Sequence, residues 1–332
     1  MKLSKNNSHK GISLFIKLGI AIAAFAFIYQ KIFLRNDIRE IENVLGQTFS
    51  SSNYYVLSIV FLLMIVNWGL EAFKWRLLVQ RIQPISYFQA LQDVFCGITV
   101  SIFTPNRTGE FGGRIFTLEK SNRVKGILLS LTGSLSQFLV TMIAGIIALL
   151  FFIPQYTSFT NQNTWLCYSF FFLMAVLIIA LLLLYFNLRL FIDLLDKKNY
   201  ASFLKKYIPV ISDLRLSEFI QLFCLSVLRY IVFSIQFFLL LKIFNVTVSF
   251  VDGFVMIALT FFAISIIPTV AFTEISVRGS AALTFIGMLS DNAPGIICSS
   301  FLLWIINIVF PSVVGIPFVF KLNFFDKEVS AK

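Results

Sequence analysis

The sequence predicts an all-α polytopic membrane protein with about six full spans and two re-entrant broken-helix hairpins in an inverted repeat. Three observations predict it. Hydrophobic residues make up 58% of the chain and charged residues 13%, the apolar residues form long runs, and two runs are interrupted by proline-containing segments. A soluble domain carries about 25% charged residues. We therefore expect a single membrane domain, 1–332, with no soluble domain large enough for an active site.

Six runs are long enough to be full spans, because crossing the hydrocarbon core takes about 20 helical residues. The first run has no small-residue cleavage site after it, so we expect an anchored helix rather than a signal peptide. The predicted spans are 12–34, 55–80, 126–153, 165–187, 217–243 and 295–321.

Two further apolar regions, 87–118 and 251–289, are interrupted. The first breaks around Pro105 and Gly109, and the second breaks around Pro268. Neither side of either break is comfortably long enough to cross a bilayer. We therefore predict that each region forms two half-helices that meet at an unwound tip.

The distribution of Lys and Arg favours re-entrant hairpins over crossings. If both regions enter and leave on one side, the basic 188–216 loop shares a side with both termini. If both regions cross, that loop moves outside, which contradicts the positive-inside rule. We therefore place both termini in the cytoplasm. The same asymmetry explains the net charge of +11 without a nucleic-acid partner.

The two halves of the chain share one plan, in which two spans precede a broken hairpin and a further span follows it. The first repeat covers about 10–153 and the second about 165–322. The hairpins start from opposite sides, which predicts an inverted repeat with a site near the midplane. The breaks also match in residues, since each has a Pro, then Glu110 or Glu274, then Arg114 or Arg278 four positions later.

Each Glu–Arg pair has two interpretations. The pair can neutralise itself so that the hairpin can be buried, or its arginine can bind an anionic headgroup. Ionisable residues at membrane depth favour the second, and the half-helix N-termini would add to the attraction of anions. Arg107 at the first tip either joins this site or extends to the interface. The predicted substrate-binding residues are Arg107, Glu110, Arg114, Arg229, Glu274 and Arg278.

Other charged side chains lie in or beside the spans. Arg229 falls near the bilayer centre with Gln236 on the same face, and it needs a partner, for which Glu110 and Glu274 are candidates. Glu71 and Lys74 can pair at i,i+3.

Interfacial anchoring is the expected role of Lys74 and Arg76 near the cytoplasmic end of their span. Asp252 is expected to cap a helix, and the role of Asp93 is left open. The single histidine, His9, and four isolated cysteines predict neither a metal site nor a disulfide, and we expect no cofactor.

These hairpins and spans resemble the flippase-like transmembrane domain of lysylphosphatidylglycerol synthases over about residues 10–322. The second hairpin has Thr273, Ile275 and Ser276 where that family more usually has Gly. The resemblance implies a lipid flippase or translocase of the cell (inner) membrane. Its partner would be an anionic membrane lipid, either a phospholipid or a polyprenyl-phosphate-linked lipid. It also implies no enzyme activity, because only about ten residues follow the last span.

Two other functions stay open at this point. One is secondary transport of a small anionic solute, since inverted repeats with broken helices are common in such transporters. The other is a non-transporting protein of envelope assembly. The sequence also leaves open a homodimer, the particular lipid, the direction of transport and its energy source.

Overall fold

The computed structural model describes residues 53–104, 107–156, 164–187, 207, 209–267 and 274–321, and every element in these ranges is helical. The long helices are α3 (Tyr54–Val79), α6 (Arg123–Tyr156), α8 (Thr164–Phe186) and α11 (Leu216–Ile243). Towards the C-terminus, α14 (Ala293–Trp304), a π-helical turn η3 (Ile305–Val309) and α15 (Phe310–Lys321) follow one another directly. The shorter elements are α4 (Tyr87–Ser101), α5 (Gly109–Arg114), η2 (Lys120–Asn122), α10 (Pro209–Ser212), α12 (Phe250–Ile266) and α13 (Glu274–Ile286).

Five helical segments in the described part of the chain are long and apolar enough to cross a membrane. They coincide with five of the six predicted spans. The third predicted span, 126–153, is extended at both ends by the 34-residue helix α6. The predicted span 12–34 lies outside the described residues, as do Pro105, Pro268 and most of the basic 188–216 loop.

Both interrupted regions consist of two helices separated by a break, as predicted. Helices α4 and α12 have 15 and 17 residues, which at 1.5 Å per residue gives about 22 and 26 Å, short of the roughly 30 Å hydrocarbon core. Each packs against its own partner, α4 against α5 and α12 against α13. The first region departs from the prediction in one respect, because α5 has only six residues.

Glycines allow α4 and α5 to pack closely. A Cβ at Gly113 would lie 2.6 Å from the Cα of Gly97, and one at Gly97 would lie 2.8 Å from Cγ of Arg114. No side chain fits between the two backbones at this crossing. Small residues serve this purpose where membrane helices approach each other. Packing therefore requires Gly97 and Gly113 at this crossing.

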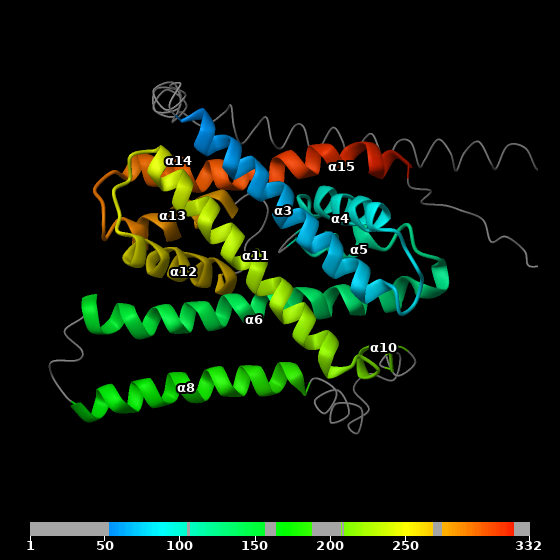
Figure 1. The fold of residues 1–332 in the computed structure, drawn as a ribbon, viewed down its shortest axis with the longest axis horizontal. Helices are drawn as coiled ribbons and strands as arrows, with labels where there is room; N and C mark the ends of the chain where they lie inside the picture. The colour runs from blue at the N-terminus through cyan, green and yellow to red at the C-terminus, as the bar shows by residue number, and fades with distance from the viewer. Residues whose placement is uncertain are drawn as a thin grey trace, which may run out of the picture.

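Helices α3 and α11 pack together through the middle of the molecule, and the two broken regions lie towards opposite ends of the bundle (Figure 1). Helix α6 contacts both α5 and α12, so it runs past both broken regions. The main core lies between α3, α4, α11, α12, α13 and α14, and its fully buried side chains include Trp75, Leu240, Met256 and Ile257.

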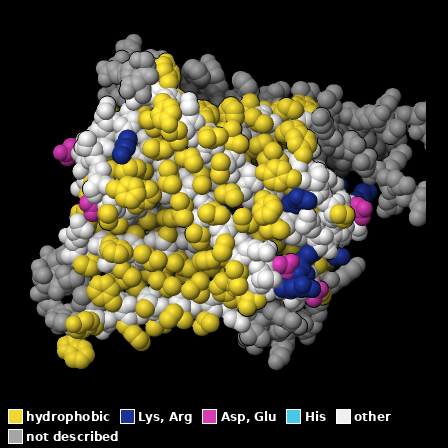
Figure 2. Space-filling model, viewed as in Figure 1, with side chains coloured by type: hydrophobic (Ala, Val, Ile, Leu, Met, Phe, Trp, Pro, Cys, Tyr) yellow, Lys and Arg dark blue, Asp and Glu magenta, His cyan; other side chains and the backbone are white. Residues whose placement is uncertain are grey.

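The outer surface is apolar over most of the face seen in Figure 2, and Lys, Arg, Asp and Glu gather near its edges. Helix α8 presents large apolar side chains such as Trp165 and Phe172, which are 82% and 72% exposed. A soluble monomer seldom exposes so large an apolar area. Lipid is the solvent that suits this surface.

The N-terminus of α12 corrects one expectation. The N-cap is Ser249, whose Oγ accepts from the backbone N–H of Asp252 at 3.1 Å. Asp252 lies in the first turn instead, and its carboxylate accepts from the Ser249 hydroxyl at 2.7 Å. The serine thus takes the capping position expected for the aspartate, and the aspartate holds the serine side chain in place.

Candidate functional site

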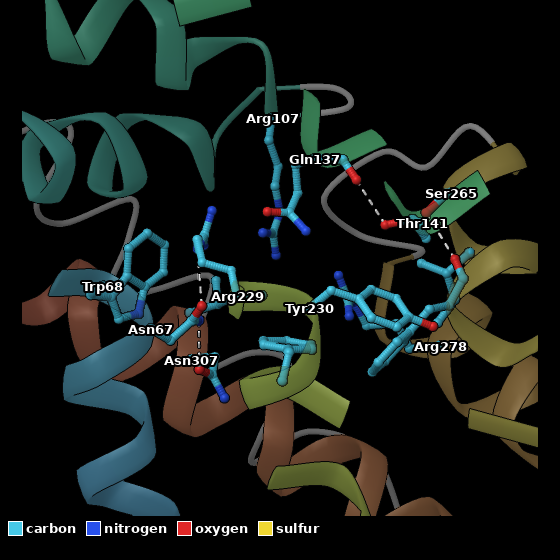
Figure 3. A pocket seen from close by; sticks show the side chains of 14 residues that line it. Asn67, Trp68, Arg107, Gln137, Thr141, Arg229, Tyr230, Ser265, Arg278 and Asn307 are labelled. Atoms are coloured by element: carbon cyan, nitrogen blue, oxygen red, sulfur yellow. Dashed lines mark hydrogen bonds between the residues drawn. The ribbon is translucent and has the colours of Figure 1, made fainter. Parts of the chain in front are cut away.

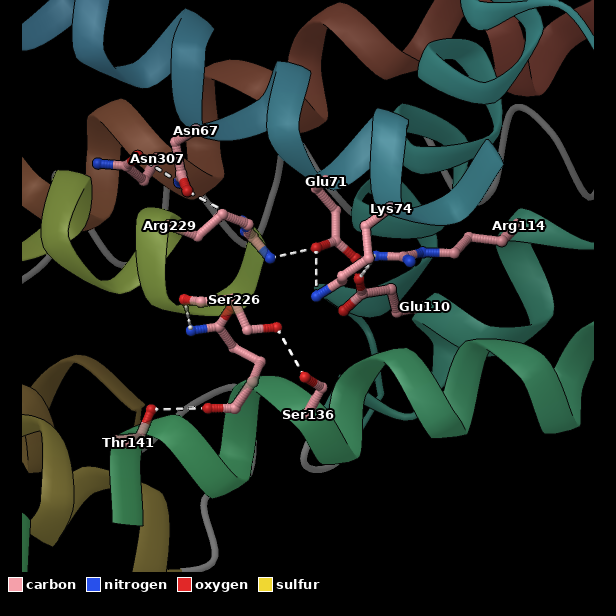
Figure 4. Close-up of polar contacts among 11 residues, drawn as sticks. Asn67, Glu71, Lys74, Glu110, Arg114, Ser136, Thr141, Ser226, Arg229 and Asn307 are labelled. Atoms are coloured by element: carbon pink, nitrogen blue, oxygen red, sulfur yellow. Dashed lines mark hydrogen bonds and ion pairs between the residues drawn. The ribbon is translucent and has the colours of Figure 1, made fainter. Parts of the chain in front are cut away.

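A buried network of charges centres on Glu71 in α3. Its Oε2 lies 2.9 Å from Nζ of Lys74 and also pairs with Nη1 of Arg229 from α11, while its Oε1 lies 2.7 Å from Nη2 of Arg114 from α5. Glu71 and Lys74 are 3% and 1% exposed. One carboxylate therefore joins three cations from three helices (Figure 4).

Glu110 completes this network, because its Oε1 pairs with the same Nη2 of Arg114. The predicted i,i+4 pair is thus present, yet Arg114 also reaches Glu71. Two expectations are corrected. The partner of Arg229 is Glu71, not Glu110 or Glu274. Lys74 is fully buried in the network and does not anchor the protein at the interface.

Two asparagines extend the network from Arg229. Nε of Arg229 donates to Oδ1 of Asn67 at 3.0 Å, and Nδ2 of Asn67 donates to Oδ1 of Asn307 at 3.4 Å. Asn307 lies in the π-helical turn η3. Four positions later, Pro311 has no N–H for the carbonyl of Asn307, which gives the helix a reason to depart from α geometry there. The orientation of Arg229 is fixed by these contacts and by Glu71.

A second group of charges joins the two broken regions. Arg107 follows the first break, and its Nη2 lies 2.6 Å from Oε1 of Glu274, the first residue of α13. The same oxygen lies 3.0 Å from Nη2 of Arg278. The predicted Glu274–Arg278 pair is therefore present, and Arg107 has an ion-pair partner at the start of the second half-helix.

A cavity of about 210 Å³ lies between these two groups of charges. Arg107, Arg229 and Arg278 line it from the first broken region, α11 and α13 (Figure 3). No acidic residue is among its described lining. Its other polar lining residues are Asn67, Gln137, Thr141, Tyr230, Ser265 and Asn307, and its apolar ones are Trp68, Phe233, Phe261, Ile264 and Ile308.

The cavity suits a small anionic group. Pockets that enclose a drug-sized ligand have about 300 Å³ or more, so this space is sized for a smaller group. Guanidinium groups bind phosphate and carboxylate oxygens through paired hydrogen bonds. Across both groups of charges, five cations face three glutamates, and the buried Asp93 adds one further carboxylate. The balance of charge around the cavity is therefore positive.

Other candidate residues have structural partners. Asp93 is buried and accepts hydrogen bonds from Trp75 Nε1 at 3.0 Å and Thr117 Oγ1 at 2.6 Å. Gln236 is buried and donates to the carbonyl of Val60 at 2.9 Å. In the described ranges, no group of three or more His, Cys, Asp or Glu side chains could hold a metal ion.

The structure divides the six predicted substrate-binding residues. Three of them, Arg107, Arg229 and Arg278, line the cavity. Arg114 and Glu110 lie in the network around Glu71, and Glu274 lies between Arg107 and Arg278. With only six residues, α5 also offers too short a helix for the anion attraction expected of the first half-helix.

Sequence reasoning missed the structural importance of Glu71, Asn67 and Asn307. A signal for the first two exists, because Asn67, Glu71 and Lys74 recur at helical spacing inside an apolar run. Asn307 stands alone between apolar residues, and nothing in its surroundings indicates that it meets Asn67, 240 positions away.

The fold and the buried charges define a multi-pass membrane protein with an arginine-lined cavity between two broken-helix regions. The family profile described as the lysylphosphatidylglycerol synthase TM region matches residues 14–315. The chain belongs to this family, as its hairpin motifs predicted. No curated protein and no solved structure gives a significant match.

Proposed function

We propose that this protein translocates an anionic lipid between the leaflets of a bilayer, with the headgroup passing through the arginine-lined cavity. The observation that carries the proposal is the convergence of Arg107, Arg229 and Arg278 on one space without an acidic lining residue. Membership of a family defined on the membrane region of a lipid synthase supports a lipid as the cargo. The acyl chains stay in the bilayer, because the cavity of about 210 Å³ holds only a headgroup.

The arrangement of the broken regions supports a transport cycle. Both regions double back on themselves and supply residues to the same cavity. We propose that they are re-entrant hairpins related by an inverted repeat, which is the architecture that builds a midplane site in secondary transporters. Two related halves around one site give a simple basis for exposing that site alternately to each leaflet.

The orientation proposed from the sequence has support in side-chain contacts. Arg81 pairs with Glu218 and donates to the carbonyl of Asp213 at 2.9 Å. The end of α3 and the start of α11 therefore lie together, as the positive-inside arrangement requires. We propose that this end faces the cytoplasm of a cell membrane, with both termini on the same side.

A leaflet-exchange assay in proteoliposomes tests the function. Fluorescent phosphatidylglycerol and a short-chain polyprenyl phosphate are tried separately, with the native protein, Arg278→Gln and the matched control Lys120→Gln. Lys120 is an exposed cation outside the cavity. We expect exchange by the native protein and the control, and a loss of about tenfold or more in Arg278→Gln, because a charge-assisted contact to phosphate is removed.

Two results would contradict lipid translocation. Equal exchange by all three proteins would show that the lipid headgroup does not pass through the cavity. Absence of exchange with either lipid, together with uptake of a soluble anion such as inorganic phosphate, would favour a solute transporter.

A further inference from the structure

One carboxylate oxygen is shared by arginines from the two halves of the chain. Oε1 of Glu274 lies 2.6 Å from Nη2 of Arg107 and 3.0 Å from both Nε and Nη2 of Arg278. Arg107 and Glu274 are 167 positions apart. This oxygen therefore connects the first broken region to the second directly.

Both arginines are also part of the cavity wall, whereas Glu274 is not among its lining residues. Their side chains keep 29% and 16% of their surface accessible, and both residues line the cavity, so each can meet a ligand there. One carboxylate compensates one of the two positive charges. An anion entering the cavity therefore meets a pair of arginines whose charge is half neutralised by the protein itself.

We propose that Glu274 occupies the position of a ligand oxyanion, and that a phosphate-type headgroup displaces it from Arg107. This inference rests on the proposed function and specifies how its site is regulated. A phosphate presents several oxygens to two guanidinium groups, whereas Glu274 offers them one oxygen. Binding then releases the contact between the broken regions, because the same Arg107 cannot keep both partners in its original geometry.

Arg107, which makes the contact with Glu274, has an uncommon backbone conformation. Its φ is 56°, in the left-handed region that residues with a Cβ seldom adopt. The protein then has two arrangements, one with Arg107 paired to Glu274 and one with that pair released. An anion shifts the protein towards the released arrangement only if it binds that arrangement more tightly.

The test compares anion affinity of the full chain in nanodiscs before and after removal of the competing carboxylate. The variant is Glu274→Gln, and the control is Glu218→Gln, which removes another arginine-paired carboxylate at the Arg81 end of α11. Short-chain phosphatidylglycerol and inorganic phosphate are the two probes. We expect Glu274→Gln to bind the lipid about tenfold more tightly or better, since an intramolecular competitor is removed, and the control to stay within about twofold of native.

The two probes distinguish a lipid headgroup from free phosphate as the source of the oxyanion. Tighter binding of the lipid, with or without tighter binding of phosphate, supports the proposal for the translocated headgroup. Tighter binding of inorganic phosphate alone would overturn it for the lipid. Unchanged or weaker binding of both probes by a folded Glu274→Gln protein would overturn it altogether.

A second measurement keeps the proposal testable if Glu274→Gln fails to fold. Spin labels are placed at Gly112→Cys in α5 and Gly279→Cys in α13, in a background without the native cysteines. A Cβ at either glycine would meet no atom within 4 Å. We expect the distance between the labels to increase when short-chain phosphatidylglycerol is added, and to be increased already in Arg107→Gln. A distance that neither the lipid nor the substitution changes would overturn the proposal.

Leaflet exchange in the same preparations separates this inference from the proposed function. Normal exchange by the native protein with unchanged anion affinity in Glu274→Gln would reject displacement of Glu274 and leave translocation standing. Absence of both exchange and binding in every variant would reject both.

Discussion

Arg107 and Glu274 are joined by an ion pair of 2.6 Å that connects the two interrupted helical regions of the chain. The contact lies beside a cavity lined by Arg107, Arg229 and Arg278. Across the cavity, Glu71 binds Lys74, Arg114 and Arg229. Each group of charges ties elements from distant parts of the sequence, so the same side chains fix the fold and set the charge of the cavity.

The first prediction concerns the stability supplied by Glu71. Glu71→Gln leaves the buried Lys74 and Arg114 and the partly buried Arg229 with Glu110 as the remaining carboxylate, and an uncompensated buried charge is expensive. We expect a loss of about 3–5 kcal/mol, measured as a fall in the unfolding temperature in detergent. Glu119→Gln is the matched control, because Glu119 is exposed, and we expect a change within about 0.5 kcal/mol.

A second substitution tests whether charge imbalance is the cause. Lys74→Met added to Glu71→Gln removes one of the unpaired cations while keeping an apolar side chain of similar length. We expect the double variant to recover part of the lost stability, as replacement of buried ions by apolar groups often does. A double variant less stable than Glu71→Gln would contradict this explanation.

Adjacent glycines give a sharp test of the hairpin packing. A Cβ at Gly113 would lie 2.6 Å from Cα of Gly97, whereas one at Gly112 would meet nothing within 4 Å. We expect Gly113→Ala to cost about 1–3 kcal/mol through overpacking. Gly112→Ala should be neutral or stabilising by about 0.5–1 kcal/mol, because alanine favours the helix. Thermal unfolding of both proteins measures the difference, and equal stabilities would argue against this crossing of α4 and α5.

The charge of the cavity predicts selectivity among headgroups. Three arginines line the space without an acidic lining residue among the described residues. The added amine of an aminoacylated headgroup would find no carboxylate partner among these lining residues, so its burial there is unfavourable. We expect phosphatidylglycerol to exchange at least about tenfold faster than its lysyl ester. The measurement is leaflet exchange of the two lipids in the same vesicles, and a faster lysyl ester would contradict an arginine-based preference.

The residues that sequence reasoning placed correctly are those with strong local patterns. The apolar runs predicted α3, α6, α8 and α11 to within a few residues, because length and hydropathy decide a span. The i,i+4 spacing predicted Glu110–Arg114 and Glu274–Arg278, because one helical turn brings the side chains together.

Contacts between distant segments were not predictable in the same way. The choice of Glu71 as the partner of Arg229 depends on how α3 packs against α11, which no local spacing encodes. The position of Lys74 near the end of its span indicated an interfacial role. In the structure Lys74 is buried instead, because Glu71 one turn earlier neutralises its charge and other helices cover it. The meeting of Arg107 with Glu274 likewise depends on the placement of two broken regions in three dimensions.

The last prediction concerns which ends of the molecule face each side of the membrane. The link between α5 and α6 lies at one end of the molecule, and the link between α13 and α14 lies at the other (Figure 1). Lys120 and Asp291 are exposed residues in these two links. If the Lys- and Arg-rich end is cytoplasmic, Lys120→Cys should react with an impermeant thiol reagent only in inverted vesicles, and Asp291→Cys only in intact cells.

Labelling is scored by the mass shift of the purified protein, in a background without the native cysteines so that only the introduced thiol reacts. Reaction of both positions from the same side would contradict a re-entrant second region, because three spans and that region separate the two positions. Reaction from opposite sides in the reverse sense would keep the second region re-entrant and place the α5–α6 link outside, against the proposed orientation. The relative sides of the two positions therefore test the second broken region, and the absolute side of Lys120 tests the orientation of the α5–α6 link. Neither substitution touches the arginines of the cavity.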